Sequence, residues 1–320
     1  SWKETTLKIL AVDDDPFILE LLPAMFEQAD LNDLHTAPSG PAALDMIKAQ
    51  KVPFDCMLLD VDMPEMDGIE LCRRIRTVPG YEDKPILMLT AKTDSISIEK
   101  AFAAGANDYI AKPFNLKDIY NRIRVAERLL VSSKTIKRID ASDLSKEGTQ
   151  VPEDITLADK VFLANVGRLI LSFSLGNYIT QLDRSELDNY QVFGVSIDDA
   201  ERIFEETSQQ GFLHILTSVA ETLTDLITCP HLLMSYEGNG AFLCITRDPN
   251  LPEWDRMEAG LQAKLDALDL LSDDLKQESI SLSVGTPIAP NANRTQRVKK
   301  TFERALSRAE MRYASKCAAA

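Results

Sequence analysis

Apolar and polar positions in residues 7–131 follow two alternating spacings. Short apolar runs with the composition of buried strands occupy residues 7–12, 33–37, 54–60, 85–90 and 107–111. Segments with helical spacing separate these runs, and one of them, residues 16–29, begins with a proline, which suits the first turn of a helix. Five strands that alternate with helices predict an α/β domain with a flavodoxin-like, doubly wound parallel sheet.

The last helical segment of this domain repeats apolar residues at positions 116, 119, 123, 126 and 130. Spacings of three and four fit either a stripe that faces the domain core or the seam of a coiled coil. We favour the core-facing stripe and keep a homodimer through this domain as the alternative.

A second α/β domain is predicted after a polar, aperiodic linker at residues 132–155. Its expected helices cover residues 156–167, 198–228, 253–276 and 297–315. Its expected strands cover residues 168–174, 232–236, 240–246 and 279–289, and the middle two form a hairpin around residues 237–239. The predicted domains are therefore residues 1–131 and 156–320, the second with a mixed or antiparallel sheet.

Composition narrows the possible functions. A chain of 320 residues with 45% hydrophobic content suits two domains, and a net charge of −15 without a basic run disfavours DNA binding. The five cysteines are scattered without zinc-ligand spacing, as in reduced cytosolic proteins. Neither a membrane-spanning apolar stretch nor a signal sequence is found, so we expect a cytoplasmic protein without membrane contact.

Polar residues follow the predicted strands of the first domain. Asp13 and Asp14 follow the first strand, Asp60 ends the third, Thr90 ends the fourth and Lys112 follows the fifth. Because ligands bind beyond the carboxyl ends of parallel strands, these side chains are expected to converge. Carboxylates placed together repel by about 4 kcal/mol per pair at an effective dielectric near 20, so the site needs a cation, and Mg²⁺ suits oxygen ligands. A carboxylate beside such an ion can attack phosphorus and become an aspartyl phosphate.

The segments AVDDDP, LLDVDMPEMDG, MLTA and DYIAKPF, in this order, resemble the receiver domains of two-component response regulators over about the first 130 residues. The resemblance implies that Asp60 is the phosphoacceptor and that Asp14 and Asp60 bind Mg²⁺ directly. It also implies a third ligand from the backbone carbonyl of Asp62, and a contact of Asp13 through water.

The same resemblance assigns the remaining site residues. Lys112 forms a salt bridge to the phosphoryl group, and its peptide bond to Pro113 is expected to be cis. Thr90 and Tyr109 resemble the switch pair, in which the hydroxyl moves to the phosphate and the ring turns inward.

The second domain resembles the diguanylate cyclase (GGDEF) family through the order of its hairpin, strand and terminal helix. The resemblance implies metal-binding acids on the hairpin and on the first strand of the domain. Gly240 and Ala241 stand at the hairpin positions, and the expected first strand offers Ser172 and Ser174. Glu310 stands where the family has a phosphate-binding lysine, so this domain is expected to be a degenerate, inactive cyclase.

These features favour a response regulator that takes a phosphoryl group from a sensor histidine kinase or phosphotransfer protein. Its catalytically inactive second domain is then expected to act through contacts with a downstream protein, rather than as an enzyme. The alternatives are an active diguanylate cyclase that makes cyclic di-GMP from GTP, a non-catalytic nucleotide-binding sensor, and a hydrolase that uses Asp60. The hydrolase is disfavoured because phosphoaspartate hydrolases carry their nucleophile on the first strand.

Overall fold

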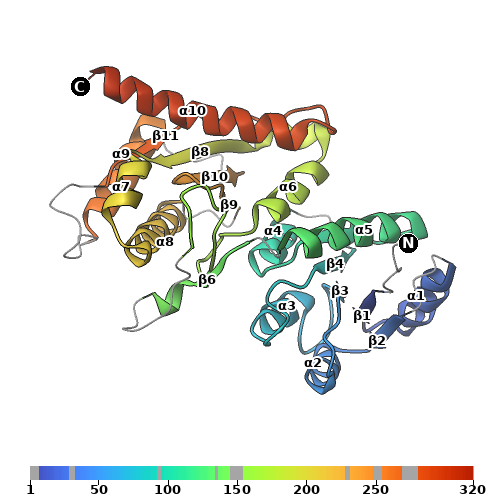
Figure 1. Cartoon of the computed structure of the whole chain (residues 1–320). Coiled ribbons are helices and arrows are strands. Elements are labelled where there is room, and N and C mark those ends of the chain that lie inside the picture. The colour runs from blue at the N-terminus through green and yellow to red at the C-terminus, as the bar shows by residue number, and fades with distance from the viewer. Residues whose placement is uncertain are drawn as a thin grey trace, which may run out of the picture. The chain divides into compact units, whose positions relative to one another are not determined.

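The computed structural model describes residues 7–28, 33–91, 95–133, 136–144, 154–227, 231–247, 254–268 and 280–319. The chain divides into an amino-terminal unit, Ser1–Thr135, and a carboxyl-terminal unit, Ile136–Ala320. Figure 1 shows the helices and strands of both units. Each unit is described by itself.

The amino-terminal unit contains the predicted five-stranded parallel sheet. Its strand order is β2-β1-β3-β4-β5, and every neighbouring pair is parallel. The strands are β1 (Lys8–Val12), β2 (Asp33–Ala37), β3 (Cys56–Asp60), β4 (Ile86–Thr90) and β5 (Asp108–Ala111). The expected doubly wound sheet is thereby confirmed for this unit.

Helices cover both faces of this sheet, as Figure 1 shows. They are α1 (Pro16–Gln28), α2 (Gly40–Ala49), α3 (Gly68–Arg76), α4 (Ser95–Ala103) and α5 (Leu116–Ser133). Successive strand residues point to opposite faces. Leu10 and Met57 therefore share a core with α2 and α3, whereas Ile9 and Leu58 share one with α1 and α5.

The apolar stripe on α5 faces the core of the amino-terminal unit. Ile119, Ile123 and Ala126 are 0%, 1% and 3% exposed and pack in the cluster that includes Ile9 and Leu58. The side chain of Leu130 lies outside the described residues. This burial supports the core-facing interpretation of the stripe over a coiled-coil seam.

The carboxyl-terminal unit contains a four-stranded sheet of the order β11-β8-β10-β9 and a separate two-stranded parallel sheet, β6-β7. All three pairs in the larger sheet are antiparallel, and one isolated parallel bridge joins Leu169 to Met234. The strands are β6 (Arg138–Asp140), β7 (Phe162–Ala164), β8 (Gln191–Ile197), β9 (Leu233–Tyr236), β10 (Ala241–Thr246) and β11 (Leu282–Val284). The helices are α6 (Ser172–Gln181), α7 (Ala200–Glu206), α8 (Gln209–Leu226), α9 (Trp254–Asp266) and α10 (Arg297–Ala319), with short 3-10 turns at Ala141–Asp143 and Arg184–Asn189.

Two layers of helices enclose the four-stranded sheet. The buried residues of α8 and α9 pack with those of β8 and β10 in one hydrophobic core. Helix α10 packs on β8 from the other side, and Figure 1 shows it running along that strand. The close contact between α10 and the sheet requires glycine at two positions. A Cβ on Gly194 would lie 2.8 Å from the Ala305 carbonyl oxygen, and a Cβ on Gly285 would lie 2.5 Å from the Ala309 nitrogen.

Two predicted elements of the carboxyl-terminal unit are wrong. The described residues 154–167 contain turns and β7 instead of a helix, and the predicted strand 168–174 is a single bridge at Leu169 followed by the start of α6. A short apolar run does not distinguish a strand from a buried helix, and here the run lies across a helix start. Strand β8, one of the two inner strands of the larger sheet, was not predicted from the sequence.

The predicted linker, residues 132–155, is shorter in the structure. Helix α5 continues to Ser133, and β6 pairs with β7 inside the carboxyl-terminal unit. Residues 145–153 lie outside the described residues. Strand β6 was not predicted because the residues around Arg138 are mostly polar. Three residues are also too few to show the alternation of apolar and polar positions that indicates a strand.

Candidate functional site

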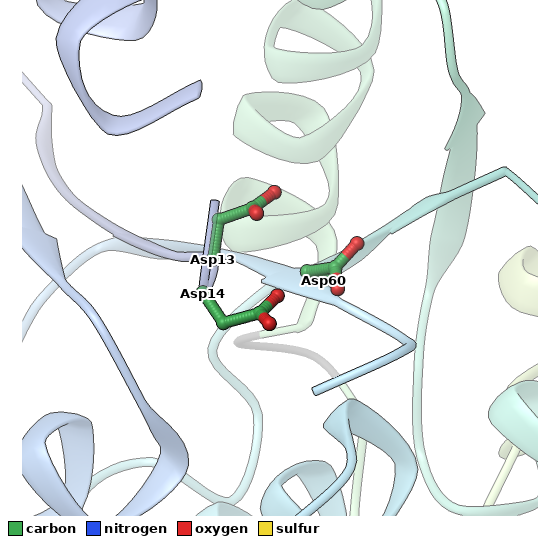
Figure 2. A group of neighbouring side chains, drawn as sticks. All are labelled: Asp13, Asp14 and Asp60. Carbon is green, nitrogen blue, oxygen red and sulfur yellow. The ribbon is translucent and has the colours of Figure 1, made fainter. Parts of the chain in front are cut away.

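Three carboxylates meet at the carboxyl edge of the parallel sheet. Asp13 and Asp14 directly follow β1, and Asp60 is the last residue of the neighbouring strand β3. One carboxylate oxygen of each lies within 4.8 Å of the others, and Figure 2 shows the three side chains grouped there. Asp13 and Asp60 are 0% and 4% exposed, whereas Asp14 is exposed. The predicted convergence of these residues is confirmed.

Lys112 joins two of these carboxylates. Its Nζ donates to Asp13 Oδ2 at 2.6 Å and to Asp60 Oδ1 at 2.7 Å. The backbone N–H of Lys112 donates to the Thr90 carbonyl at 2.7 Å, which fixes the chain just beyond β5. The bond from Lys112 to Pro113 is cis, as the receiver resemblance implies.

The shared environment changes the pKa values of both partners. Burial raises the pKa of the Asp60 carboxyl, against the hydrogen bond from Lys112, and the charges of Asp13 and Asp14 add to the rise. Burial alone would lower the pKa of Lys112, but its hydrogen bonds to Asp60 and Asp13 outweigh burial and the net shift is upward. The lysine is therefore charged, and Asp60 holds its proton more tightly than an ordinary aspartate.

A tight loop after β3 holds Asp60 in place. The Gly68 N–H donates to the Val61 carbonyl at 3.0 Å, and a Cβ on Gly68 would lie 2.0 Å from the Asp60 carbonyl oxygen. The Asp67 carboxylate accepts from the Glu70 N–H and caps α3. No role for Gly68 was predicted, although Asp67 directly before a helix that begins at Gly68 is a recognisable signal of a cap.

The proposed switch residues lie on adjacent strands. Tyr109 pairs with Met88 and Thr90 with Ala111 in the β4-β5 register, so Thr90 and Tyr109 share one face of the sheet. Thr90 is 2% exposed, and Tyr109 is half-buried against the core that includes Met88. The placement is compatible with a switch pair, and the switch itself stays a prediction.

The acidic cluster has the donor chemistry of a magnesium site. Three carboxylates supply hard oxygen ligands, and Mg²⁺ typically binds one or two carboxylates and keeps several waters. In the part of the chain that the structure describes, no other group of three His, Cys, Asp or Glu lies so close together. The roles of the Asp62 carbonyl and of a water on Asp13 stay predictions.

The hairpin of the carboxyl-terminal unit offers few donors to a ligand. The N–H groups of Glu237, Asn239, Gly240 and Ala241 donate to protein acceptors, at distances of 2.7–3.1 Å. Asn239 donates to the Leu157 carbonyl, outside the hairpin. A phosphate cradle needs such N–H groups to point at the ligand, and here they are already used.

The predicted positions around this hairpin need one correction. Ser172 and Ser174 belong to α6, and the strand next to β10 is β8, which is followed by Asp198 and Asp199. The expectation that the first strand of this sheet has no carboxylate next to it is therefore wrong, because that strand is β8 and not residues 168–174. One oxygen of each acid has a partner: Asp198 Oδ2 lies 3.3 Å from Lys316 Nζ, and Asp199 accepts from the Tyr313 hydroxyl, whereas Asp198 Oδ1 is buried without a hydrogen bond to any described residue. The sequence signal was the Asp-Asp pair directly after an apolar run.

Fold and site together define a doubly wound α/β domain with an acidic cluster and a lysine at the carboxyl edge of its sheet, and the comparisons with known proteins agree with this class. Residues 9–124 match the family model of the response regulator receiver domain. The heme response regulator HssR of Staphylococcus aureus strain JH9 is 36% identical over 160 residues, which cover 49% of this chain and 69% of HssR. The chain belongs to the response regulators of two-component systems.

Solved receiver structures also match this chain. Chemotaxis protein CheY4 of Vibrio cholerae is 34% identical and covers 38% of this chain and 99% of its own, with a TM-score of 0.36. A response regulator from Chloroflexus aurantiacus is 36% identical and covers 40% of this chain and 99% of its own, with the same TM-score of 0.36. Among the described residues, no helix is both long enough and apolar enough to cross a membrane.

Proposed function

We propose that this response regulator accepts a phosphoryl group on Asp60 from a histidine kinase or phosphotransfer protein. The observation that carries the proposal is the bridge from Lys112 Nζ to Asp13 and Asp60, at 2.6 and 2.7 Å, beside the exposed carboxylate of Asp14. A nucleophilic carboxylate, a fixed cation and a set of oxygen ligands are the groups that phosphoryl transfer to aspartate needs.

Each residue of the site has its own role in phosphoryl transfer. A carboxylate oxygen of Asp60 attacks phosphorus, and the phosphorus bond to the donor nitrogen breaks, so the imidazole leaves with the electron pair and takes a proton. Lys112 neutralises charge on the transferred oxygens. Asp14, Asp60 and the backbone carbonyl of Asp62 would hold Mg²⁺ directly, and Asp13 would hold it through a water; the ion supplies further charge neutralisation when it is bound.

Phosphorylation would then change the receiver surface through Thr90 and Tyr109. The new phosphoryl oxygens attract the Thr90 hydroxyl, which leaves space that the Tyr109 ring can fill. The shared sheet face of these two residues supports this coupling.

We assign the carboxyl-terminal unit as a degenerate GGDEF-like domain that acts by protein contact rather than catalysis. Three features support this assignment: Gly240 and Ala241 replace the expected hairpin acids, the hairpin N–H groups are occupied, and Asp198 is paired with Lys316. If the purified protein converts GTP to cyclic di-GMP, the assignment fails and the cyclase alternative is correct. Tight GTP binding without product would favour the nucleotide-sensor alternative.

Labelling with acetyl phosphate and Mg²⁺ tests the phosphoacceptor role. We expect the wild type to incorporate phosphate that hydroxylamine releases, as from an acyl phosphate, and Asp60→Asn to incorporate none. Asp45→Asn, which changes an exposed carboxylate on α2, is the matched control and should label like the wild type. Equal labelling of Asp60→Asn and the wild type would refute the proposal.

A further inference from the structure

A polar cavity lies in the carboxyl-terminal unit, between the end of α6 and the start of α10. Its volume is about 830 Å³, and it is lined by Gln181, Leu182, Asp183, Arg184, Ala292, Asn293, Arg294 and Arg297. Small-molecule sites commonly occupy about 300–1,000 Å³, so this volume admits a molecule larger than a single inorganic ion.

Arg297 forms a buried, fixed cation in the wall of this cavity. The residue is 2% exposed, and its guanidinium donates to main-chain carbonyls, among them Leu182 at 2.7 Å and Asn291 at 2.8 Å. No carboxylate among the described residues bonds to it. Burial lowers the pKa of Arg297, the charges of Arg294 and Arg184 lower it further, and the charge of Asp183 opposes this fall. The wall therefore carries a buried cation that forms no direct ion pair with the one nearby acid, and such a charge is costly.

Two further arginines line the cavity without a partner. Arg184 and Arg294 are exposed, and the guanidinium group of neither forms a hydrogen bond or an ion pair with any residue that the structure describes. Asp183 is the single acid in the lining, and its carboxylate accepts from the Ser185 N–H at 3.0 Å. Three cations against one carboxylate make the cavity positive, in a chain whose net charge is −15.

The start of α10 adds to this positive potential. The first turn of this 23-residue helix contains no acidic residue, although the amino-terminal end of a helix favours negative charge. Arg297 begins the helix, and Lys299 and Lys300 follow within the same turn. An anion in the cavity would interact favourably with the helix dipole and with the arginines together.

We propose that this cavity binds the phosphoryl group of a small phosphorylated molecule. Guanidinium groups bind phosphate oxygens through paired hydrogen bonds, and Arg184 and Arg294 provide two such groups beside the buried charge of Arg297. The remaining volume accommodates the organic part of a phosphate ester. The lining shares no residue with the Asp60 cluster or with the hairpin around Gly240, so the proposal does not depend on the proposed phosphotransfer.

Calorimetric titration of the full chain tests the proposal, in EDTA and at constant ionic strength. The probes are inorganic phosphate, AMP and adenosine. We expect saturable binding of phosphate, AMP or both, and none of adenosine. Tighter binding of AMP than of phosphate identifies a phosphate ester as the ligand class, whereas equal binding identifies phosphate alone; both support the site.

Two double variants separate this cavity from general electrostatics. Arg184→Gln with Arg294→Gln removes two exposed, unpaired arginines from the lining and should weaken binding by about tenfold or more. Lys299→Gln with Lys300→Gln removes the same charge from the same end of α10, outside the lining, and should change the dissociation constant by less than about threefold. Absence of saturable binding to the wild type, binding of adenosine, or equal loss in both variants would overturn the proposal.

Discussion

Lys112 Nζ lies 2.7 Å from Asp60 Oδ1, although the two residues are 52 positions apart in the chain. The contact joins the residue after β5 to the last residue of β3, across the intervening strand β4. The lysine is thus already positioned where a phosphoryl group on Asp60 would carry its negative charge. Three predictions concern the groups around this contact.

Removal of the Lys112 charge should slow phosphorylation without removing the acceptor. Loss of one preorganised cationic donor commonly costs about 10²–10³ in rate, so we expect Lys112→Gln to label from acetyl phosphate roughly 100-fold more slowly. Lys117→Gln, which changes an exposed lysine on α5, should label at the wild-type rate. A normal rate in Lys112→Gln would show that this contact has no part in transfer.

Magnesium should stabilise the amino-terminal unit through the exposed acid of the cluster. At a concentration ten times the dissociation constant, binding adds about 1.4 kcal/mol to the free energy of unfolding. We expect Mg²⁺ to raise the melting temperature of the wild type and to have little effect on Asp14→Asn. Without Mg²⁺, Asp14→Asn should be the more stable protein, because the Asp14 charge raises the pKa of Asp60 and repels its ionised form.

The matched control for this experiment is Asp15→Asn. The Asp15 carboxylate accepts from the Phe17 N–H at the start of α1, a role that asparagine can also fill. Its Mg²⁺ response should equal that of the wild type. An unchanged Mg²⁺ response in Asp14→Asn would remove Asp14 from the ligand set.

The loop after β3 should not tolerate a side chain at Gly68. An alanine Cβ would lie 2.0 Å from the Asp60 carbonyl oxygen, so the backbone of the site residue itself must move. We expect Gly68→Ala to lower the free energy of unfolding by about 3 kcal/mol and to weaken the Mg²⁺ response. Gly260→Ala is the control. Gly260 lies inside α9, and a Cβ there would meet the Leu226 side chain at 3.4 Å, an ordinary van der Waals contact. Denaturant titration should find Gly260→Ala at least as stable as the wild type.

The sequence predicted the amino-terminal unit well because its signals are local and repeated. Four of its five strands carry a polar site residue at or just after the strand end, such as Asp13 after β1 or Asp60 in β3. Parallel topology then brings those residues together without further information. The contribution of Gly68 depends on a contact between two backbone segments, which spacing does not show.

The carboxyl-terminal unit was harder to predict because β6, β7 and β8 do not stand out from their surroundings, unlike the predicted hairpin of β9 and β10. Strand β8 contains Gly194, which sheet propensity disfavours but which the close approach of α10 requires. The apolar run at residues 168–174 looked more like a strand than β8 did. The interaction of Asp198 with Lys316, 118 positions away, arises from packing of the last helix and has no signature in the local sequence.

Glu258 should be a principal polar link within the carboxyl-terminal unit. Its carboxylate accepts from the Val284 N–H at 2.9 Å and from Arg312 at 2.8 Å, so it joins α9, β11 and α10. Burial opposes ionisation, but Arg312 and Val284 outweigh it and lower the pKa of Glu258. Glu258→Gln should therefore lower the free energy of unfolding at pH 7 by about 1–3 kcal/mol, and by less as the pH falls through the carboxyl pKa.

The exposed pair of Lys299 and Glu303, 3.9 Å apart on α10, provides the control for Glu258. Glu303→Gln should change the free energy of unfolding by less than about 0.5 kcal/mol, because solvent screens an exposed pair. Similar effects of the two substitutions would contradict a specific role for Glu258.

Asp108 should make the stability of the amino-terminal unit depend on pH in the direction opposite to Glu258. Its side chain is 1% exposed, and burial raises its pKa to about 6 despite the charge of Arg122, 3.0 Å away. Between the unfolded and folded pKa values, the folded state binds more protons than the unfolded state, so stability falls as pH rises. From pH 5 to pH 7.5, a folded pKa of about 6 corresponds to a loss of about 1.4 kcal/mol in the free energy of unfolding. Urea titrations of the wild type and Asp108→Asn at both pH values measure this contribution of Asp108 to the free energy of unfolding, since asparagine does not titrate. The stability of the wild type relative to Asp108→Asn should fall by that amount over this range, and a difference that stays constant or grows with pH would show that Asp108 is already ionised at pH 5.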